Sequence, residues 1–305
     1  MTTVSLPPLP ESLSAEARAQ ISAISAATVT APTSIAEMRE QSLAIQRQIS
    51  ALQRAIYAVD VSDDVIDGVP VRVFEPKGGS AHRGVLLNAH GGGFLVDSGS
   101  LTENVPLCAL TGIRIIAVRY RLAPEHPYPA AVDDMVSVYR SLLRDRGSKH
   151  IGLYGTSAGA VLAAQTVVRL KREKLSLPAV VGFFSGSADF AQIGDSEQFI
   201  PAPGGMTLRD IVTPYVAQTP RTDPGLSPLY ADLSGFPPTL LISSTRDQLL
   251  SQTAMFHRAL LKSQVSAQFV VFEGLPHAFW AYLMAPESTA AFELMASFLA
   301  AELQD

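Results

Sequence analysis

The sequence predicts an α/β fold in which a mainly parallel sheet carries helices on both faces. The first observation is that short apolar runs alternate with longer segments of helical periodicity through most of the chain. The second is a serine flanked by glycines, placed directly between such a run and a helical segment. The third is size: 305 residues with 47% hydrophobic content suffice for one large core.

The elements follow in chain order. Residues 11–57 predict two helices, with apolar residues at helical spacing at Ile45, Ile49, Leu52 and Ile56. Residues 58–74 predict two short strands joined by a turn at Asp67-Gly68. Further strands are expected at 85–89, 113–120, 151–154, 180–185, 239–244 and 268–272. Further helices are expected at 130–144, 158–172, 249–262 and 289–303.

This alternation lapses between residues 190 and 223. The segment contains the run Ile200-Pro-Ala-Pro-Gly-Gly-Met206 and a short helix expected at 208–216. An insertion at this point of the chain lies naturally over the strand ends, as a lid.

The glycine-flanked serine is Ser157, in Tyr154-Gly-Thr-Ser-Ala-Gly159. A helix that follows a strand at once requires a sharp turn, and Gly155 and Gly159 remove the Cβ atoms that would obstruct it. The start of the next helix favours negative charge beside the serine. Ser157 is therefore the candidate nucleophile.

A second motif follows the apolar run at 85–89, in His90-Gly-Gly-Gly-Phe94. Three successive glycines cost backbone entropy without any packing return, so they indicate main-chain N–H groups that must closely approach a ligand. In acyl transfer that ligand is the oxyanion. The expected donors are the N–H groups of Gly92, Gly93 and Ala158.

A serine hydroxyl needs a histidine base, and the base needs an orienting carboxylate. Of six histidines, His277 is preferred because it follows a strand-like run on a Gly/Pro loop near the chain's end. Asp247 is the preferred acid because it directly follows the strand expected at 239–244. Asp189, after the strand at 180–185, is the alternative acid.

Together these residues resemble the hormone-sensitive-lipase-like carboxylesterases, or GDXG family, of the α/β-hydrolase superfamily. The resemblance runs from about residue 60 to the end and includes Tyr120-Arg-Leu-Ala-Pro-Glu-His-Pro-Tyr-Pro-Ala-Ala131. Ser227-Pro-Leu229 and Phe236-Pro-Pro-Thr239 extend it. Thr156 replaces the aspartate of many members, as in a GTSAG branch, and Gln248 stands where many relatives carry proline.

The resemblance implies a domain organisation as well. Residues 1–57 would form part of a cap over the catalytic body at 58–305, and residues 190–223 would form the rest. Candidate substrate-binding residues are then the apolar side chains expected under the cap and beside the triad. These are Phe94, Met206, Leu208, Ile211, Tyr215 and Phe279.

The expected reaction is two-step hydrolysis of short to medium acyl esters through an acyl-enzyme on Ser157, with no metal or organic cofactor. A lactonase, amidase or deacetylase would use the same residues, and so remains an alternative. A non-catalytic ligand receptor is disfavoured because receptors of this fold typically lose the histidine.

Composition restricts the partners and the location. A net charge of −5 and a pI near 5.7 argue against nucleic acid or an anionic membrane surface. The single cysteine, Cys108, excludes an internal disulfide and is expected to be buried on a helix. No basic-then-apolar leader and no apolar run of about 18 residues is evident, so a cytoplasmic protein is expected. The resemblance adds a homodimer formed through the final strand and closing helix.

Overall fold

The computed structural model describes residues 7–27, 32–200 and 207–303. Within them one eight-stranded sheet has the order β1-β2-β4-β3-β5-β6-β7-β8. The strands β1 and β2 join it antiparallel, and the remaining pairs are parallel. The strands are β1 Val59–Ile66, β2 Val69–Pro76, β3 Val85–Ala89, β4 Arg114–Val118, β5 Ile151–Thr156, β6 Val180–Phe184, β7 Thr239–Arg246 and β8 Ala267–Pro276.

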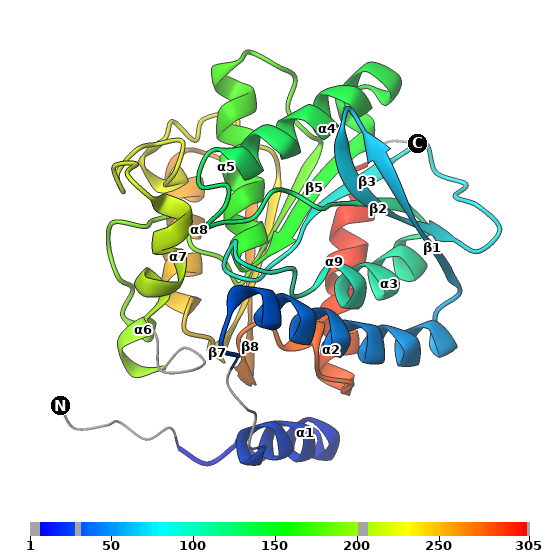
Figure 1. Ribbon diagram of the computed structural model, residues 1–305, viewed down its shortest axis with the longest axis vertical. Coiled ribbons are helices and arrows are strands. Elements are labelled where there is room, and N and C mark those ends of the chain that lie inside the picture. Colours follow the sequence, from blue (N-terminus) through cyan, green and yellow to red (C-terminus); the bar gives the residue numbers. More distant parts are fainter. Residues whose placement is uncertain (1–6, 28–31, 201–206, 304–305) are drawn as a thin grey trace.

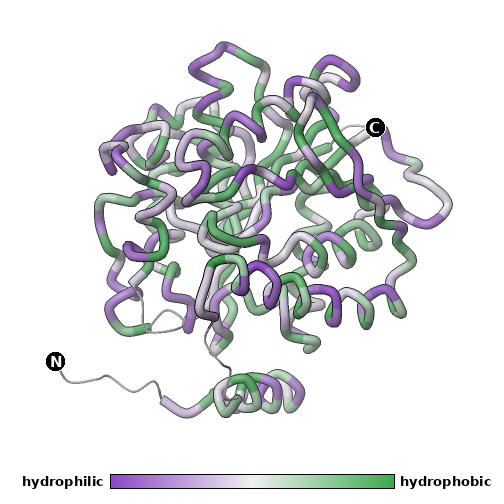
Figure 2. Tube along the Cα trace, in the orientation of Figure 1, coloured by the Kyte–Doolittle hydropathy of each residue, from purple (hydrophilic) through white to green (hydrophobic). Residues whose placement is uncertain are grey.

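Helices cover both faces of this sheet (Figure 1). On one face, α4 (Ala130–Arg146), α5 (Ala158–Arg172) and α8 (Leu250–Lys262) bury a first apolar cluster. On the other face, α3 (Ser100–Thr111) and α9 (Pro286–Ala301) bury a second. The central strands are hydrophobic along the chain (Figure 2) because neither face meets water. The predicted α/β class with a mainly parallel sheet is confirmed.

Most elements lie within a few residues of their predicted positions, and two departures matter for the site. The helix α3 was not among the predicted helical ranges, although Cys108 is buried on it as expected. The strand β8 continues to Pro276 and so brings the next residue, His277, to the carboxyl end of the sheet. The predicted turn at Asp67-Gly68 is present, with φ of 52° and 79° at the two residues.

The two predicted N-terminal helices are α1 (Ala15–Ala26) and α2 (Ile35–Ile56), but several apolar side chains of α2 are mostly exposed. Ile45, Leu52 and Ile56 are 55%, 60% and 68% exposed. The helix instead buries Gln46, Ser50 and Gln53. The loop beneath α2 presents carbonyl oxygens that need hydrogen-bond donors, which a polar helix face supplies.

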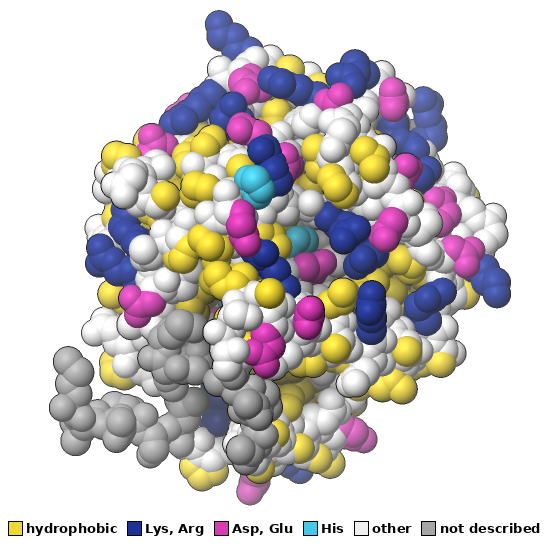
Figure 3. All heavy atoms as spheres, in the orientation of Figure 1, with side chains coloured by type: hydrophobic (Ala, Val, Ile, Leu, Met, Phe, Trp, Pro, Cys, Tyr) yellow, Lys and Arg dark blue, Asp and Glu magenta, His cyan; other side chains and the backbone are white. Residues whose placement is uncertain are grey.

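The insertion contains α6 (Ser196–Phe199) and α7 (Leu208–Val216), and the 3-10 turn η3 (Pro228–Tyr230) follows it. The predicted short helix at 208–216 is thus present. On the face drawn in Figure 3, charged side chains of both signs are interspersed with hydrophobic ones. None of the helices in the described ranges is both long and apolar enough to cross a membrane.

Candidate active site

Ser157 occupies the sharp turn between β5 and α5, with φ 58° and ψ −121°. A non-glycine residue at positive φ is strained, and such strain concentrates at functional sites. The flanking glycines are needed sterically. A Cβ on Gly159 would lie 1.9 Å from the carbonyl oxygen of Ala89, and one on Gly155 would lie 2.3 Å from the backbone of Gly159. The packing of α5 against β3 therefore requires the glycines that the sequence motif supplied.

The structure brings Ser157, His277 and Asp247 into one chain of hydrogen bonds. His277 Nε2 lies 2.9 Å from Ser157 Oγ, and His277 Nδ1 lies 2.7 Å from Asp247 Oδ1. An ionised carboxylate can only accept, so Nδ1 carries the proton that it donates to Asp247. In the neutral ring Nε2 then has a free lone pair and accepts from the serine hydroxyl.

Asp247 is fully buried beyond the end of β7. Its Oδ2 accepts from the Ser243 hydroxyl at 2.8 Å, and its Oδ1 accepts from the N–H of Leu249 at 2.9 Å. Burial alone would raise the pKa of this carboxyl, but the charge and hydrogen bond of His277, together with the hydrogen bond from the Leu249 N–H, hold the pKa below its usual value. Asp247 is thus a fixed negative charge beneath the imidazole.

The alternative acid, Asp189, has no hydrogen bond to His277 among the described residues. Its Oδ1 accepts from the N–H of Ala191 at 2.7 Å, and its Oδ2 accepts from the Tyr230 hydroxyl at 3.2 Å. Asp189 therefore stabilises the turn that follows β6.

The glycine loop lies beside Ser157, and two of its glycines have positive φ values: 115° at Gly92 and 62° at Gly93. A Cβ on Gly92 would lie 2.1 Å from the carbonyl oxygen of Val96, and one on Gly93 would lie 2.6 Å from Ile211 of α7. Only glycine fits at these two positions, because the loop passes so close to Val96 and to Ile211. Ala158 is the first residue of α5, so its N–H has no partner within the helix.

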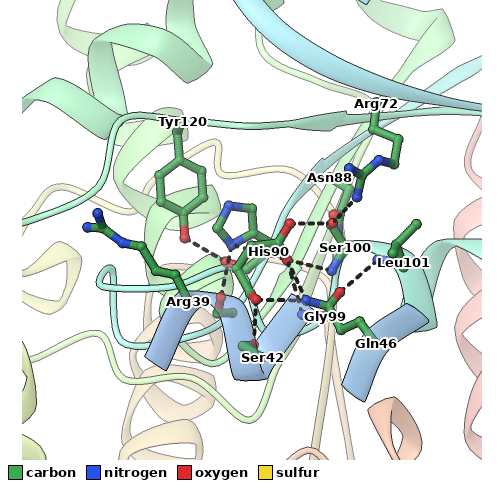
Figure 4. A network of polar contacts seen from close by, with 12 residues as sticks. Arg39, Ser42, Gln46, Arg72, Asn88, His90, Gly99, Ser100, Leu101 and Tyr120 are labelled. Carbon is green, nitrogen blue, oxygen red and sulfur yellow. Dashed lines mark hydrogen bonds and ion pairs between the residues drawn. The ribbon is translucent and has the colours of Figure 1, made fainter. Parts of the chain in front are cut away.

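A buried polar network fixes this loop from behind (Figure 4). The His90 ring stacks on Tyr120 at 4.1 Å, and the Tyr120 hydroxyl donates to the His90 carbonyl at 2.7 Å. His90 Nδ1 lies 3.9 Å from an Asp97 carboxylate oxygen, which accepts from the N–H of Ser100 at 2.9 Å. Burial would raise the pKa of Asp97, but His90 and Ser100 hold it below its usual value.

Helix α2 is part of this network. Gln46 Nε2 donates to the Asp97 carbonyl at 2.7 Å, and Gln46 Oε1 accepts from the N–H of Leu101 at 3.0 Å. The Ser42 hydroxyl donates to the same Asp97 carbonyl at 2.7 Å. Helix α2 thereby holds the segment that follows the glycine loop.

Two chambers meet at Ser157 and His277. The first, of about 470 Å³, lies between the body and the α2 and α7 segments. Its lining includes Phe94, Leu208 and Ile211, as predicted, and also Met38 and Ile45 of α2. The wall of this chamber formed by α2 and α7 is largely apolar, since it includes Met38, Ile45, Leu208 and Ile211.

Two of the predicted pocket residues, Tyr215 and Phe279, do not line this chamber. Tyr215 is fully buried, stacks on Phe94 at 3.6 Å and donates its hydroxyl to Gln165 at 2.7 Å, so it supports the wall from behind. Phe279 is fully buried in the second apolar cluster, against Trp280, because the turn after His277 points it into the core. Met206 lies outside the described residues.

The second chamber, of about 1070 Å³, opens on the other side of Ser157 toward α1. Glu103 of α3 and Thr156 line it together with Ser157, His277 and Ala278. Sequence reasoning missed Glu103, Asp97 and Gln46. The acidic residues lie on α3 and just before it, in a stretch for which the sequence predicts no helix, and Gln46 is not one of the apolar positions that predict the helix at this place.

Within residues 7–27, 32–200 and 207–303, no three His, Cys, Asp or Glu side chains are grouped in a way that could hold a metal ion. The donors at the site are the hydroxyl, imidazole, carboxylate and main-chain N–H groups already described. These are the groups that covalent acyl transfer uses.

Comparison with known proteins shows the family of the chain. Residues 86–281 match the model of a family described as alpha/beta hydrolase fold. An esterase of Acinetobacter venetianus is 30% identical over 75% of this chain and 78% of its own length. An acetyl-hydrolase of Streptomyces hygroscopicus is 32% identical over 70% and 74%.

Solved structures of esterases share the fold of this chain. The crystal structure of an esterase with 31% identity superposes with a TM-score of 0.83 and covers 98% of both chains. An esterase from the bacterial hormone-sensitive lipase family, 27% identical, covers 90% of this chain and 94% of its own, with a TM-score of 0.80.

Proposed function

Because the chain belongs to the hormone-sensitive-lipase-like carboxylesterases of the α/β-hydrolase fold, we propose that Ser157, His277 and Asp247 are the catalytic triad of this ester hydrolase. The observation that carries the proposal is the continuous hydrogen-bond chain from the serine hydroxyl through the imidazole to a buried carboxylate. Ser157 also stands at a strained turn where both chambers meet.

In the first step Ser157 Oγ attacks the ester carbonyl carbon while its proton passes to His277 Nε2. The carbonyl oxygen becomes an oxyanion, which accepts hydrogen bonds from the N–H groups of Gly92, Gly93 and Ala158. Collapse of the tetrahedral intermediate breaks the carbon–oxygen bond of the leaving alcohol. His277 then transfers its proton to that alkoxide, and the acyl group remains on Ser157.

In the second step a water molecule takes the place of the alcohol. It gives its proton to His277 Nε2 as its oxygen attacks the acyl-enzyme carbonyl. The second intermediate expels Ser157 Oγ, which recovers the proton from His277, and the carboxylic acid leaves. Asp247 stays ionised throughout and stabilises the imidazolium that forms in each half.

The helices α1 and α2 and the segment 190–223 form the cap in this proposal. Met38 and Ile45 of α2 and Ile211 of α7 line the first chamber together with the glycine loop. The cap therefore supplies apolar contact area to the substrate, and α2 also holds the oxyanion loop through Gln46.

The substrates we propose are short to medium acyl esters. A first chamber of about 470 Å³ matches a small ligand. Similar proteins carry the names acetyl-hydrolase and acetyl esterase, which is in line with a short acyl group. We expect esters of roughly two to eight acyl carbons to be hydrolysed faster than emulsified long-chain triglycerides.

We also propose that the chain forms a homodimer through β8 and α9. The strand β8 is the last of the sheet order, so one of its edges has no neighbour within the described sheet. Val271 on this strand is 42% exposed. Light scattering coupled to size exclusion would show twice the chain mass, and a monomer at micromolar concentration would refute the dimer.

The test of the triad is Ser157→Ala. We expect the variant to lose hydrolysis of p-nitrophenyl butyrate and covalent labelling by phenylmethylsulfonyl fluoride, with an unchanged circular dichroism spectrum. Mass spectrometry of the labelled wild-type protein should place the adduct on Ser157. An adduct on another serine, or persistent labelling of the variant, would refute the assignment.

A further inference from the structure

Glu103 is a buried carboxyl group that the proposed reaction does not use. It belongs to α3, is 2% exposed, and lines the second chamber together with Ser157 and His277. Its Oε2 atom has no hydrogen-bond partner among the described residues. Buried polar groups are nearly always paired, so an unpaired carboxyl oxygen beside a substrate chamber suggests a partner that arrives with the ligand.

The ionisation of Glu103 follows from these surroundings. An ionised carboxylate without a partner is costly away from water. Burial raises the pKa of Glu103 to about 8; a Thr156 hydroxyl hydrogen bond opposes this rise and the negative charge of Asp97 adds to it. At neutral pH Glu103 therefore carries an O–H group, which is a hydrogen-bond donor.

We propose that Glu103 determines substrate specificity by donating a hydrogen bond to an acceptor oxygen on the part of the ester that enters the second chamber. This inference rests on the proposed function, because that chamber receives substrate only if Ser157 is the nucleophile. The acceptor is an ether, hydroxyl or carbonyl oxygen of the acyl or the alcohol portion, beyond the scissile bond.

The composition of the chamber supports a selective role. Much of its lining is apolar, including Leu9, Ile21, Ala278 and Ala281. In an apolar pocket, a small number of polar groups usually fixes the orientation of a small ligand. A residue needed only to fill space at this position would be apolar, because a leucine or methionine would pack there without the desolvation cost of a carboxyl group.

The experiment uses ester pairs that differ by one CH₂-to-oxygen replacement. For the acyl side these are p-nitrophenyl butyrate against methoxyacetate, and valerate against 3-methoxypropionate. For the alcohol side they are butyl acetate against 2-methoxyethyl acetate. Intrinsic reactivity cancels when each kcat/KM ratio of oxygen ester to carbon ester is compared between variants.

We expect Glu103→Met to lower this ratio about 10-fold for at least one pair, the loss of one hydrogen bond to a substrate oxygen. Glu103→Gln keeps a neutral donor of the same length and should retain most of the wild-type ratio. Unchanged ratios for all pairs in Glu103→Met, with the variant folded, would overturn the proposal.

The pH dependence of the ratio gives an independent readout. In the wild type the oxygen preference should fall as the pH rises from 7 to 9, because ionised Glu103 no longer donates. Other ionisable groups face it or line its chamber: Asp97, Tyr120, Tyr154, Arg246, His277 and Tyr282. All are present in Glu103→Gln too, so a pH-independent ratio in that variant assigns the effect to Glu103.

Failure of this proposal and failure of the triad would look different. If Ser157 is not the nucleophile, Ser157→Ala keeps its activity whatever Glu103 does. If only the Glu103 proposal is wrong, Ser157→Ala is inactive while Glu103→Met hydrolyses both members of every pair in the wild-type ratio.

Discussion

Gln46 of α2 binds both ends of the segment that leads from the oxyanion loop into α3, through the Asp97 carbonyl at 2.7 Å and the Leu101 N–H at 3.0 Å. The side chain is 2% exposed and lies 51 residues from Asp97 in the chain. One amide thus couples the N-terminal helix to the loop that carries Gly92 and Gly93. This relationship makes the helix part of the catalytic architecture in our proposal.

The first prediction follows from that coupling. Gln46→Met keeps the length of the side chain and removes both hydrogen bonds, so the oxyanion donors should be less well positioned. We expect kcat for p-nitrophenyl butyrate to fall about 10-fold with little change in KM, because misplacement affects the transition state most. Gln48→Met, at an exposed position of the same helix, is the matched control. Equal activity of the two variants would contradict the coupling.

The second prediction concerns the acid. Asp247→Asn leaves the size of the buried side chain unchanged but lets an amide donate to His277 Nδ1, which favours the wrong tautomer. We expect kcat to fall by about 10⁴, as for the corresponding change in serine proteases. Stopped-flow or endpoint hydrolysis assays with active-site titration would measure it. Near-normal activity here, combined with collapse in Asp189→Asn, would transfer the acid role to Asp189.

The third prediction tests the close packing beneath Ser157. Gly159→Ala would place a methyl group 1.9 Å from the Ala89 carbonyl oxygen, so β3 and α5 would have to separate. We expect a loss of about 3 kcal/mol or more in the free energy of unfolding, measured by urea denaturation. Gly84→Ala, where the nearest atom would be 3.4 Å away, is the control and should change stability little. Similar stabilities of both variants would contradict the packing.

The fourth prediction concerns stability against pH. The pKa of Glu103 is raised from 4.5 to about 8 by burial, so the folded protein binds this proton more tightly than the unfolded chain. The protonated Glu103 makes its full contribution to the free energy of unfolding below about pH 4.5, and this contribution is lost as the pH rises toward 8. The melting temperature of Glu103→Gln relative to wild type should therefore increase between pH 5 and pH 8. A difference that is constant over this range would show that Glu103 is already ionised in the folded state.

The candidate triad could be predicted because its members lie in locally distinctive sequence. A serine between glycines at a strand-to-helix junction, a glycine run after a strand, and polar residues just past strand ends each leave a short-range signal, as at Ser157, Gly92 and His277. The signal exists because sharp turns and close backbone approaches permit few residue types. The α/β class and most strands followed from apolar runs for the same reason.

The exposure of apolar side chains on α2 and the buried position of Gln46 could not be predicted this way. Helical periodicity locates a helix, and Ile45, Leu52 and Ile56 would ordinarily mark its buried side. Here the glutamines of the helix meet the Asp97 carbonyl and the main-chain groups of Leu101 and Thr102 at the start of α3, so they satisfy more hydrogen bonds than isoleucines would. The burial of Tyr215 and Phe279 has a related cause, since the direction of a side chain depends on the packing around it.

The sequence by itself determined the parallel α/β architecture and the residues able to form a nucleophile, a base, an acid and an oxyanion loop, since each depends on local backbone constraints. Only the tertiary structure decided that Asp247 rather than Asp189 meets His277, that Glu103 lies buried beside Ser157, and that α2 holds the glycine loop. These depend on contacts between segments 30 to more than 50 residues apart, whose geometry is set by how the whole chain packs and pairs its buried polar groups.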